Sequence, residues 1–214
     1  MKKTNSAAQQ SLHIPSGFFN ASTSEHYSSL PMKVLFAQDP FGGDTCTLNV
    51  DWGTFLNLLS IHNGVENYAL PGFCVWPKIS SMNHTNATSI IVIDYPTEFD
   101  ILKLAPQFKD IECASYVTNN SRDDGDIFRV LFPLLRPISP EKFFTLAPAI
   151  QKWADGTGSH PVSDPDCYRI GRYCEYPNCR KEDAGPRVKC YSPGWMLDER
   201  AFDELMNTGV LTLA

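Results

Sequence analysis

The hexapeptide SIIVID at residues 89–94 predicts a central strand of a β-sheet. A run of β-branched residues like this one is typical of a strand that is buried on both faces. The run ends at Asp94, and Pro96 lacks the backbone N–H that would continue the pairing. The sequence therefore predicts an acidic side chain, Asp94, at the end of a buried strand.

The segments that follow residue 94 predict the rest of this sheet. Residues 114–118 predict a strand, and residues 127–132 predict its hairpin partner across a polar turn. Thr97 is positioned to cap a helix from Glu98, and Ser139 with Pro140 predicts a longer helix with an apolar stripe. We expect an α+β fold with a mixed or antiparallel sheet of the RNA-recognition-motif type, flanked by helices. Asp94 and the turn after residue 119 are then expected at neighbouring strand ends.

Residues before this sheet predict a smaller N-terminal α/β portion. Residues 32–37 and 45–49 predict two strands around a Gly42-Gly43 turn, and residues 52–61 predict a helix capped by Asp51. Ser, Asn, Gln and Thr dominate residues 1–29, which we expect to be a flexible polar tail. Residues 30–214 are expected to form a single domain.

Composition predicts a globular cytoplasmic protein. The 214 residues are 43% hydrophobic and 20% charged, which is enough to bury a core. We expect no signal peptide, because polar residues follow the basic start, and no membrane span, because no apolar run is long enough. The odd number of cysteines, seven, favours a reducing compartment over a disulfide framework.

The distribution of charge is uneven along the chain. The formal net charge of −6 argues against a dedicated nucleic-acid binder. However, all eight arginines follow Ser121, and residues 167–190 hold six basic residues against three acidic ones. Contact with phosphate needs a local positive surface rather than a positive total. A solvated basic loop remains the alternative interpretation.

Several motifs occur in a fixed order between residues 83 and 194. After the strand that ends in Asp94 come YVTNNS at residues 116–121, FRVLFPLLRPISPE at residues 128–141, and Asp164-Pro165. This order resembles the archaeo-eukaryotic-type primase-polymerase superfamily, in its phage and plasmid branch. The resemblance implies a replication protein of a phage, plasmid or mobile element that carries out metal-dependent nucleotidyl transfer. It implies DNA and nucleotide triphosphates as partners, with a separate replicative helicase, since no Walker motif follows.

The resemblance also implies roles for individual residues. Asp94 and Asp164 match acids that would bind Mg²⁺ or Mn²⁺ and act in catalysis, and Asp166 competes with Asp164 for this role. Glu98 and Asp100 could replace a missing acid, or could be ordinary acids of a first helical turn. The side chains expected to contact the nucleotide or its phosphates are Asn120, Ser121, Arg129, Arg136, Arg169 and Arg172. For Arg129, which interrupts an apolar run, a buried pair with a carboxylate is an equal alternative.

Two departures from the family pattern weaken the prediction of activity. Pro96 occupies the position of the second metal-binding acid, and a proline cannot bind a metal. The histidine expected near Ser121 is also missing, since no histidine lies between His84 and His160. These departures favour the alternative of a catalytically inactive relative that binds nucleic acid or a replication partner.

A cysteine cluster near the basic segment raises the question of zinc. Cys174, Cys179 and Cys190 could ligate zinc, with Cys167 or His160 as the fourth ligand. The spacing does not match a zinc knuckle or ribbon. Small, reduced cysteines of the core are the alternative.

Overall fold

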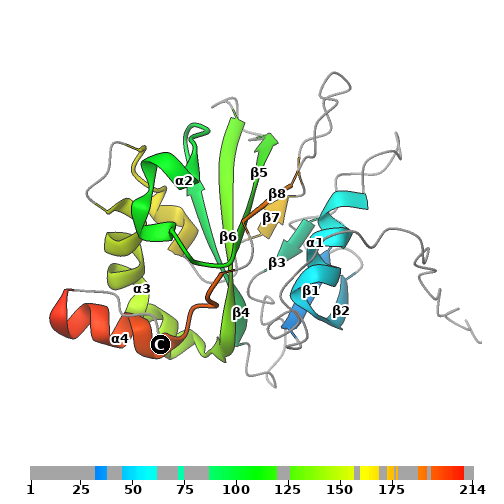
Figure 1. Cartoon of the computed structure of the whole chain (residues 1–214). Coiled ribbons are helices and arrows are strands. Elements are labelled where there is room, and N and C mark those ends of the chain that lie inside the picture. Colours follow the sequence, from blue (N-terminus) through cyan, green and yellow to red (C-terminus); the bar gives the residue numbers. More distant parts are fainter. Residues whose placement is uncertain are drawn as a thin grey trace, which may run out of the picture.

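A computed structural model shows an α+β protein (Figure 1) and describes residues 32–37, 45–61, 72–74, 87–119, 126–156, 160–168, 173–175, 177, 188–191 and 194–209. The predicted tail, residues 1–29, lies outside this set. In chain order the elements are β1 Met32–Ala37, β2 Thr45–Val50, α1 Trp52–Ile61, β3 Gly72–Cys74, β4 Thr88–Tyr95, α2 Ile101–Leu104, the 3₁₀ turn η1 Pro106–Phe108, β5 Cys113–Asn119, β6 Asp126–Ile138, α3 Pro140–Asp155, the 3₁₀ turn η2 Pro165–Tyr168, β7 Tyr173–Glu175, β8 Lys189–Tyr191 and α4 Glu199–Thr208.

The strands form two antiparallel sheets. The first has the order β2-β1-β3-β7 and the second the order β4-β6-β5-β8. Helices α2, α3 and α4 lie on one side of the second sheet, and the first sheet with α1 lies on the other (Figure 1). The α+β class is confirmed, while the RNA-recognition-motif arrangement stays a prediction. Because β6 lies between β4 and β5, Asp94 and the turn after β5 are not on neighbouring strands.

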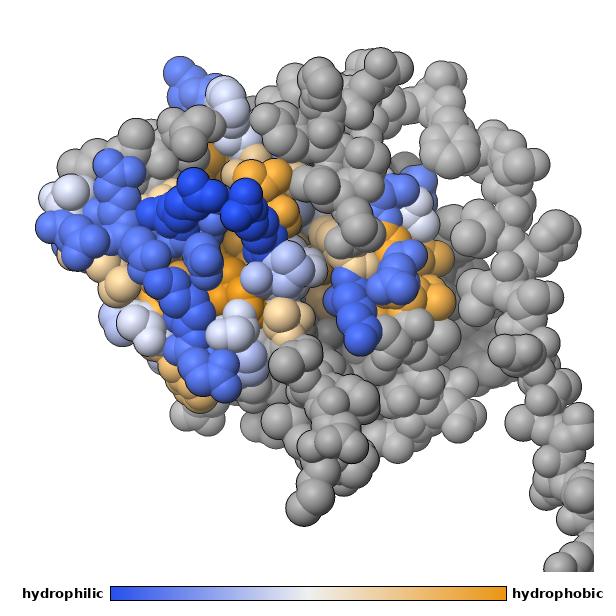
Figure 2. Space-filling view, turned by 90° about the horizontal axis from the view of Figure 1, so that it is seen from below, coloured by the Kyte–Doolittle hydropathy of each residue, from blue (hydrophilic) through white to orange (hydrophobic). Residues whose placement is uncertain are grey.

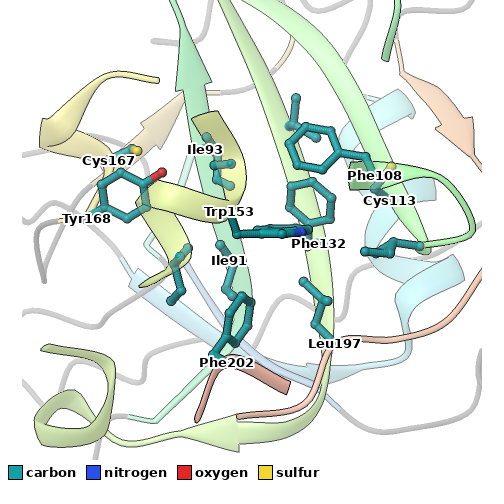
Figure 3. Packing of buried hydrophobic residues seen from close by; sticks show 14 of the residues in the cluster. Ile91, Ile93, Phe108, Cys113, Phe132, Trp153, Cys167, Tyr168, Leu197 and Phe202 are labelled. Carbon is teal, nitrogen blue, oxygen red and sulfur yellow. The ribbon is translucent and has the colours of Figure 1, made fainter. Parts of the chain in front are cut away.

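Two hydrophobic clusters cover the two faces of the second sheet. Successive side chains of a strand point to opposite faces, so Ile91 and Ile93 pack with Phe132 and Trp153 beneath the helices (Figure 3). Ile90 and its neighbours of the same parity face the first sheet and α1 in the second cluster. The core therefore has two layers, one on each side of the second sheet.

Strand β4 is buried as the sequence predicts, but its position differs from the prediction. All eight of its residues are buried. Among the described residues, however, β6 is its only strand neighbour, so β4 is the outer strand of its sheet. Its other side contacts the segment around η2, where the Asp164 amide donates to the Asp94 carbonyl at 2.8 Å. Strand β4 is buried on both faces of the sheet and along its outer edge, which explains why its residues are mostly apolar.

The predicted helix ends are largely confirmed. The Lys142 amide donates to the Ser139 hydroxyl at 3.3 Å at the start of α3, and the Thr54 amide donates to Asp51 at 2.7 Å in α1. The helix expected from Glu98 instead begins at Ile101 and has four residues. Phe99 is buried against Phe128 and His160, which takes residues 98–100 out of the helix.

The outer surface of the helical layer is mainly polar. On the face seen from below, hydrophilic residues cover much of the side that holds α3 and α4, with hydrophobic residues visible between them (Figure 2). Phe144 of α3 and Met206 of α4 are exposed at 62% and 43%. None of the described helices has both the length and the apolar character needed to cross a membrane.

Candidate functional site

Asp94 lies opposite Arg129 on β6, which in turn lies opposite Tyr116 on β5. Residues that are direct cross-strand neighbours share one face of a sheet, so the three side chains form a row. Arg129 Nε donates to Asp94 Oδ1 and Nη2 donates to Oδ2, both at 2.8 Å. Asp94 is 1% exposed and Arg129 is 3% exposed. Asp94 and Arg129 therefore form a buried, bidentate ion pair.

The electrostatics of this row follow from burial and from the pair itself. Burial lowers the pKa of Arg129, but the charge of Asp94, the hydrogen bonds to it, and the nearby Tyr116 and Cys174 together outweigh burial and hold that pKa well above its usual range. Burial raises the pKa of the Tyr116 hydroxyl, and the guanidinium only partly offsets this effect. Arg129 Nη1 donates to that hydroxyl at 3.4 Å. Of the two alternatives for Arg129, the structure shows the buried pair with a carboxylate.

Asp164 meets Asp94 through the main chain. The Asp164 amide donates to the Asp94 carbonyl, and Asp164 Oδ1 accepts from the Asp166 amide at 2.8 Å. The preceding residue, Ser163, anchors the loop because its amide and hydroxyl both donate to Asp155 Oδ1, at 2.8 and 2.5 Å. The motifs that contain Asp94 and Asp164 are therefore adjacent through their main chains, while the Asp94 carboxylate accepts from Arg129 and the Asp164 carboxylate accepts from the Asp166 amide.

The donor set around Asp94 does not fit a divalent cation as it is arranged. Both oxygens of Asp94 accept hydrogen bonds from a guanidinium, which would also repel a metal ion. Glu98 and Asp100, the possible replacement acids, instead contact Lys189 at 2.5 Å and Lys103 at 3.2 Å. In the part of the chain that the structure describes, no group of three or more His, Cys, Asp or Glu side chains is placed to hold a metal. The assignment of Mg²⁺ or Mn²⁺ stays a prediction.

Of the other residues predicted to contact phosphate, Arg136 alone lies among the described residues. Arg136 lies in the second half of β6 and is exposed. Asn120, Ser121, Arg169 and Arg172 lie outside the described residues. Their predicted roles therefore stay predictions.

The candidate zinc ligands that the structure describes lie on different elements of the fold. Cys174 is buried on β7 of the first sheet, and Cys190 is exposed on β8 of the second. Cys179 lies outside the described residues. Cys167 packs in the helix-side cluster, where the ring of His160 stacks on Phe99 with the ring centroids 5.0 Å apart. The zinc site stays a prediction.

The sequence interpretation missed Glu112, a second buried carboxylate. Glu112 is 6% exposed, and its two oxygens accept from the Trp52 indole at 3.1 Å and from the Gly194 amide at 3.0 Å. It ties α1 to the second sheet and to the segment before α4. The signal was an acidic residue directly before an apolar strand, together with a tryptophan whose N–H needs an acceptor when it is buried.

Comparisons with known proteins do not identify a family for this chain. No family model matches the chain, and no curated protein matches it. A solved structure of a cyanophage S-2L primase-polymerase, described as its AEP domain, is similar to this chain at a TM-score of 0.37 and 9% identity. That match covers 81% of this chain and 88% of the other. At this TM-score the similarity carries no argument about function.

Proposed function

We propose that the chain is a catalytically inactive, primase-polymerase-like protein that binds nucleic acid. The family-like motifs between residues 83 and 194 support the first part of this proposal. The observation that carries the absence of catalysis is the buried pair, in which Arg129 engages both oxygens of Asp94.

Nucleotidyl transfer explains why this pair matters. The reaction usually uses two metal ions that bridge the attacking and leaving oxygens, and carboxylates hold those ions. Here the carboxylate of the first motif already neutralises an arginine, and Pro96 offers no ligand at the second position. Both features support a chain that has kept the arrangement of its motifs without the metal chemistry.

The second candidate is an active primase or polymerase that prefers Mn²⁺. It is favoured by the contact between the main chains of Asp94 and Asp164, which brings two family motifs to one place. With few ligands, Mg²⁺ would be the poorer ion because it demands near-ideal octahedral geometry. Mn²⁺ would bind such a site more tightly.

Primer synthesis distinguishes the two candidates. We expect no extension of a labelled primer and no de novo product with either Mg²⁺ or Mn²⁺. Asp164→Asn is the informative variant, because its side-chain oxygen can still accept from the Asp166 amide and keep the loop folded. Synthesis with Mn²⁺ that Asp164→Asn removes would establish the second candidate instead.

Nucleic-acid binding tests the other half of the proposal. We expect weak binding of single-stranded or primer-template DNA, with affinity that falls as salt rises because each neutralised phosphate releases counterions. The variant Arg172→Ala/Arg180→Ala/Lys181→Ala removes three of the six basic residues of segment 167–190. It should reduce the slope of log K against log salt by about 2, at roughly 0.7 per contact on single strands. A matched control, Lys103→Ala/Lys109→Ala/Lys152→Ala, removes the same charge from exposed positions elsewhere and should leave the slope almost unchanged. A flat salt response of the unmodified protein would contradict a role in nucleic-acid binding.

A further inference from the structure

The row Asp94, Arg129 and Tyr116 lies in the layer between the two sheets. These residues have the same parity as Val92 and Leu131, which face the first sheet and α1. Each member belongs to a different strand, and Tyr116 packs in the same cluster as Cys174 of β7 in the first sheet. The row therefore crosses three strands of one sheet at the place where the other sheet covers them.

Arg129 donates one hydrogen bond to each of the two carboxylate oxygens of Asp94. Two parallel N–H···O bonds at 2.8 Å fix the relative orientation of both groups, as expected for a fork of this kind. The guanidinium carbon also lies 5.8 Å from the centre of the Tyr116 ring, which supplies a further favourable contact for the cation. Arg129 is thus held from two strands at once.

Exchange of this arginine for a metal ion would be costly. A divalent cation that bound Asp94 in place of the guanidinium would have to displace a side chain that is only 3% exposed. Removing one partner of a buried pair leaves an uncompensated charge, which destabilises a protein strongly. The arrangement therefore favours retention of the arginine over binding of a metal.

We propose that Arg129 is the permanent counter-ion of Asp94 and that the pair, with Tyr116, is a charged lock that fixes the register of β4, β6 and β5 beneath the first sheet. Asp94 then acts as a structural residue that does not exchange its partner for a divalent ion. This inference holds whether or not the chain binds nucleic acid, because it concerns only the layer between the sheets.

A double-mutant cycle tests the lock. Asp94→Asn and Arg129→Gln each remove one charge of the buried pair, and each should lower Tm by about 10 °C. The combined variant carries two neutral amides, and its Tm should fall by clearly less than the sum of the two single changes. The half-exposed pair Lys142–Asp203 is the control, since Asp203→Asn should lower Tm by no more than about 3 °C. A combined loss equal to the sum of the single losses would overturn the lock.

Nuclear magnetic resonance of the unmodified protein tests the metal part without any variant. The Nε–H resonance of Arg129, assigned through its contacts to the Tyr116 ring, should persist when Mn²⁺ is added in excess. A paramagnetic ion at Asp94 would broaden this resonance beyond detection, because Nε lies 2.8 Å from Asp94 Oδ1. Loss of the signal on addition of Mn²⁺, with recovery on chelation, would overturn the proposal even if the single variants fail to fold.

Discussion

At the scale of single residues, Gly194 shows how closely two main chains approach beside the buried carboxylate of Glu112. A Cβ atom at Gly194 would lie 2.3 Å from the Glu112 nitrogen and 2.4 Å from the Ile111 carbonyl carbon. Backbone atoms in a buried segment cannot move aside as the end of a flexible side chain can. The amide of Gly194 also donates to Glu112, so displacement would break the bond that ties this segment to the sheet.

Replacement of this glycine should therefore be severe. We expect Gly194→Ala to lower the free energy of unfolding by about 3 kcal/mol, at the upper end of overpacking costs. Gly209→Ala is a matched control, because its Cβ would contact nothing within 4 Å and only the left-handed φ of 75° opposes it. That change should cost about 1 kcal/mol. Urea unfolding of both variants would show the difference, and equal losses would contradict the close approach.

The ion pair shows what the sequence allowed at this scale and what it did not. The apolar run predicted Asp94 at a strand end, and an arginine in a second apolar run raised the correct alternative of a buried pair. The choice between the alternatives depended on register. A slip of one residue would turn Arg129 to the helix side of the sheet, and the sequence pattern does not fix that register.

At the scale of elements, α3 contains a residue that works against its own helix. Pro148 lies in the middle of Pro140–Asp155 and lacks the N–H that would bond to the carbonyl one turn earlier. Its side chain is exposed, so burial does not compensate for this loss. Pro140, by contrast, lies in the first turn, where the N–H has no partner in the helix.

The two prolines of α3 give a matched prediction. Pro148→Ala should raise the free energy of unfolding by about 1–2 kcal/mol, less than the full difference of ~3 kcal/mol because the helix already accommodates the ring. Pro140→Ala should change it by less than about 0.5 kcal/mol. Thermal unfolding would compare the two variants, and a loss of stability in Pro148→Ala would contradict a net cost of this proline to the helix.

Strand and helix lengths were predicted unevenly. Helices α1 and α3 follow from capping residues and apolar positions, since both signals are local. Strand β6 was predicted to end at residue 132 but continues through two prolines to Ile138. Pro137 falls where pairing with β4 is interrupted, because the register passes from Ile90 opposite Pro133 to Thr88 opposite Ile138, and Pro133 lies at the edge of that interruption. Tertiary context therefore removed the penalty that the prolines carry in an isolated strand.

At the scale of the whole molecule, several buried groups resist ionisation. Burial raises the pKa of Tyr95, Tyr116 and Tyr168 above their ordinary value of 10.0, and that of Cys113 above 9.0. Each group keeps its proton in the folded state at a pH where the unfolded chain releases it. The stability that they contribute is complete below about pH 9 and is lost as pH rises further.

Alkaline unfolding is the expected result. Once the pH exceeds the ordinary pKa of a buried group, that group should lower the free energy of unfolding by about 1.4 kcal/mol per pH unit. Urea unfolding at a series of alkaline pH values, with tyrosinate absorbance as a second signal, would measure this slope. Tyr168→Phe should reduce this slope by the contribution of one group. Near neutral pH it should lower stability only through the lost hydrogen bond with Ser163. A stability that stays constant to strongly alkaline pH would contradict the burial of these hydroxyls.

The pairing of distant strands was beyond the sequence pattern. Strand β3 pairs with β7, about 100 residues later in the chain, and β5 pairs with β8. Strands of three residues are too short to show the alternation that marks a half-buried strand. The two sheets and the layer between them therefore emerge only from tertiary structure.

The outer position of β4 has a consequence for protein synthesis. The residues that cover its outer side, around Asp164, come about 70 residues after the strand in the chain. At ~5–20 residues per second, a ribosome needs about 4–14 s to produce them. During that interval the nascent chain displays an apolar strand with an unsatisfied backbone edge, which is the template that cross-β aggregation requires. The risk of aggregation therefore depends on the order in which the segments are translated. We expect chaperones to bind the nascent chain during this interval.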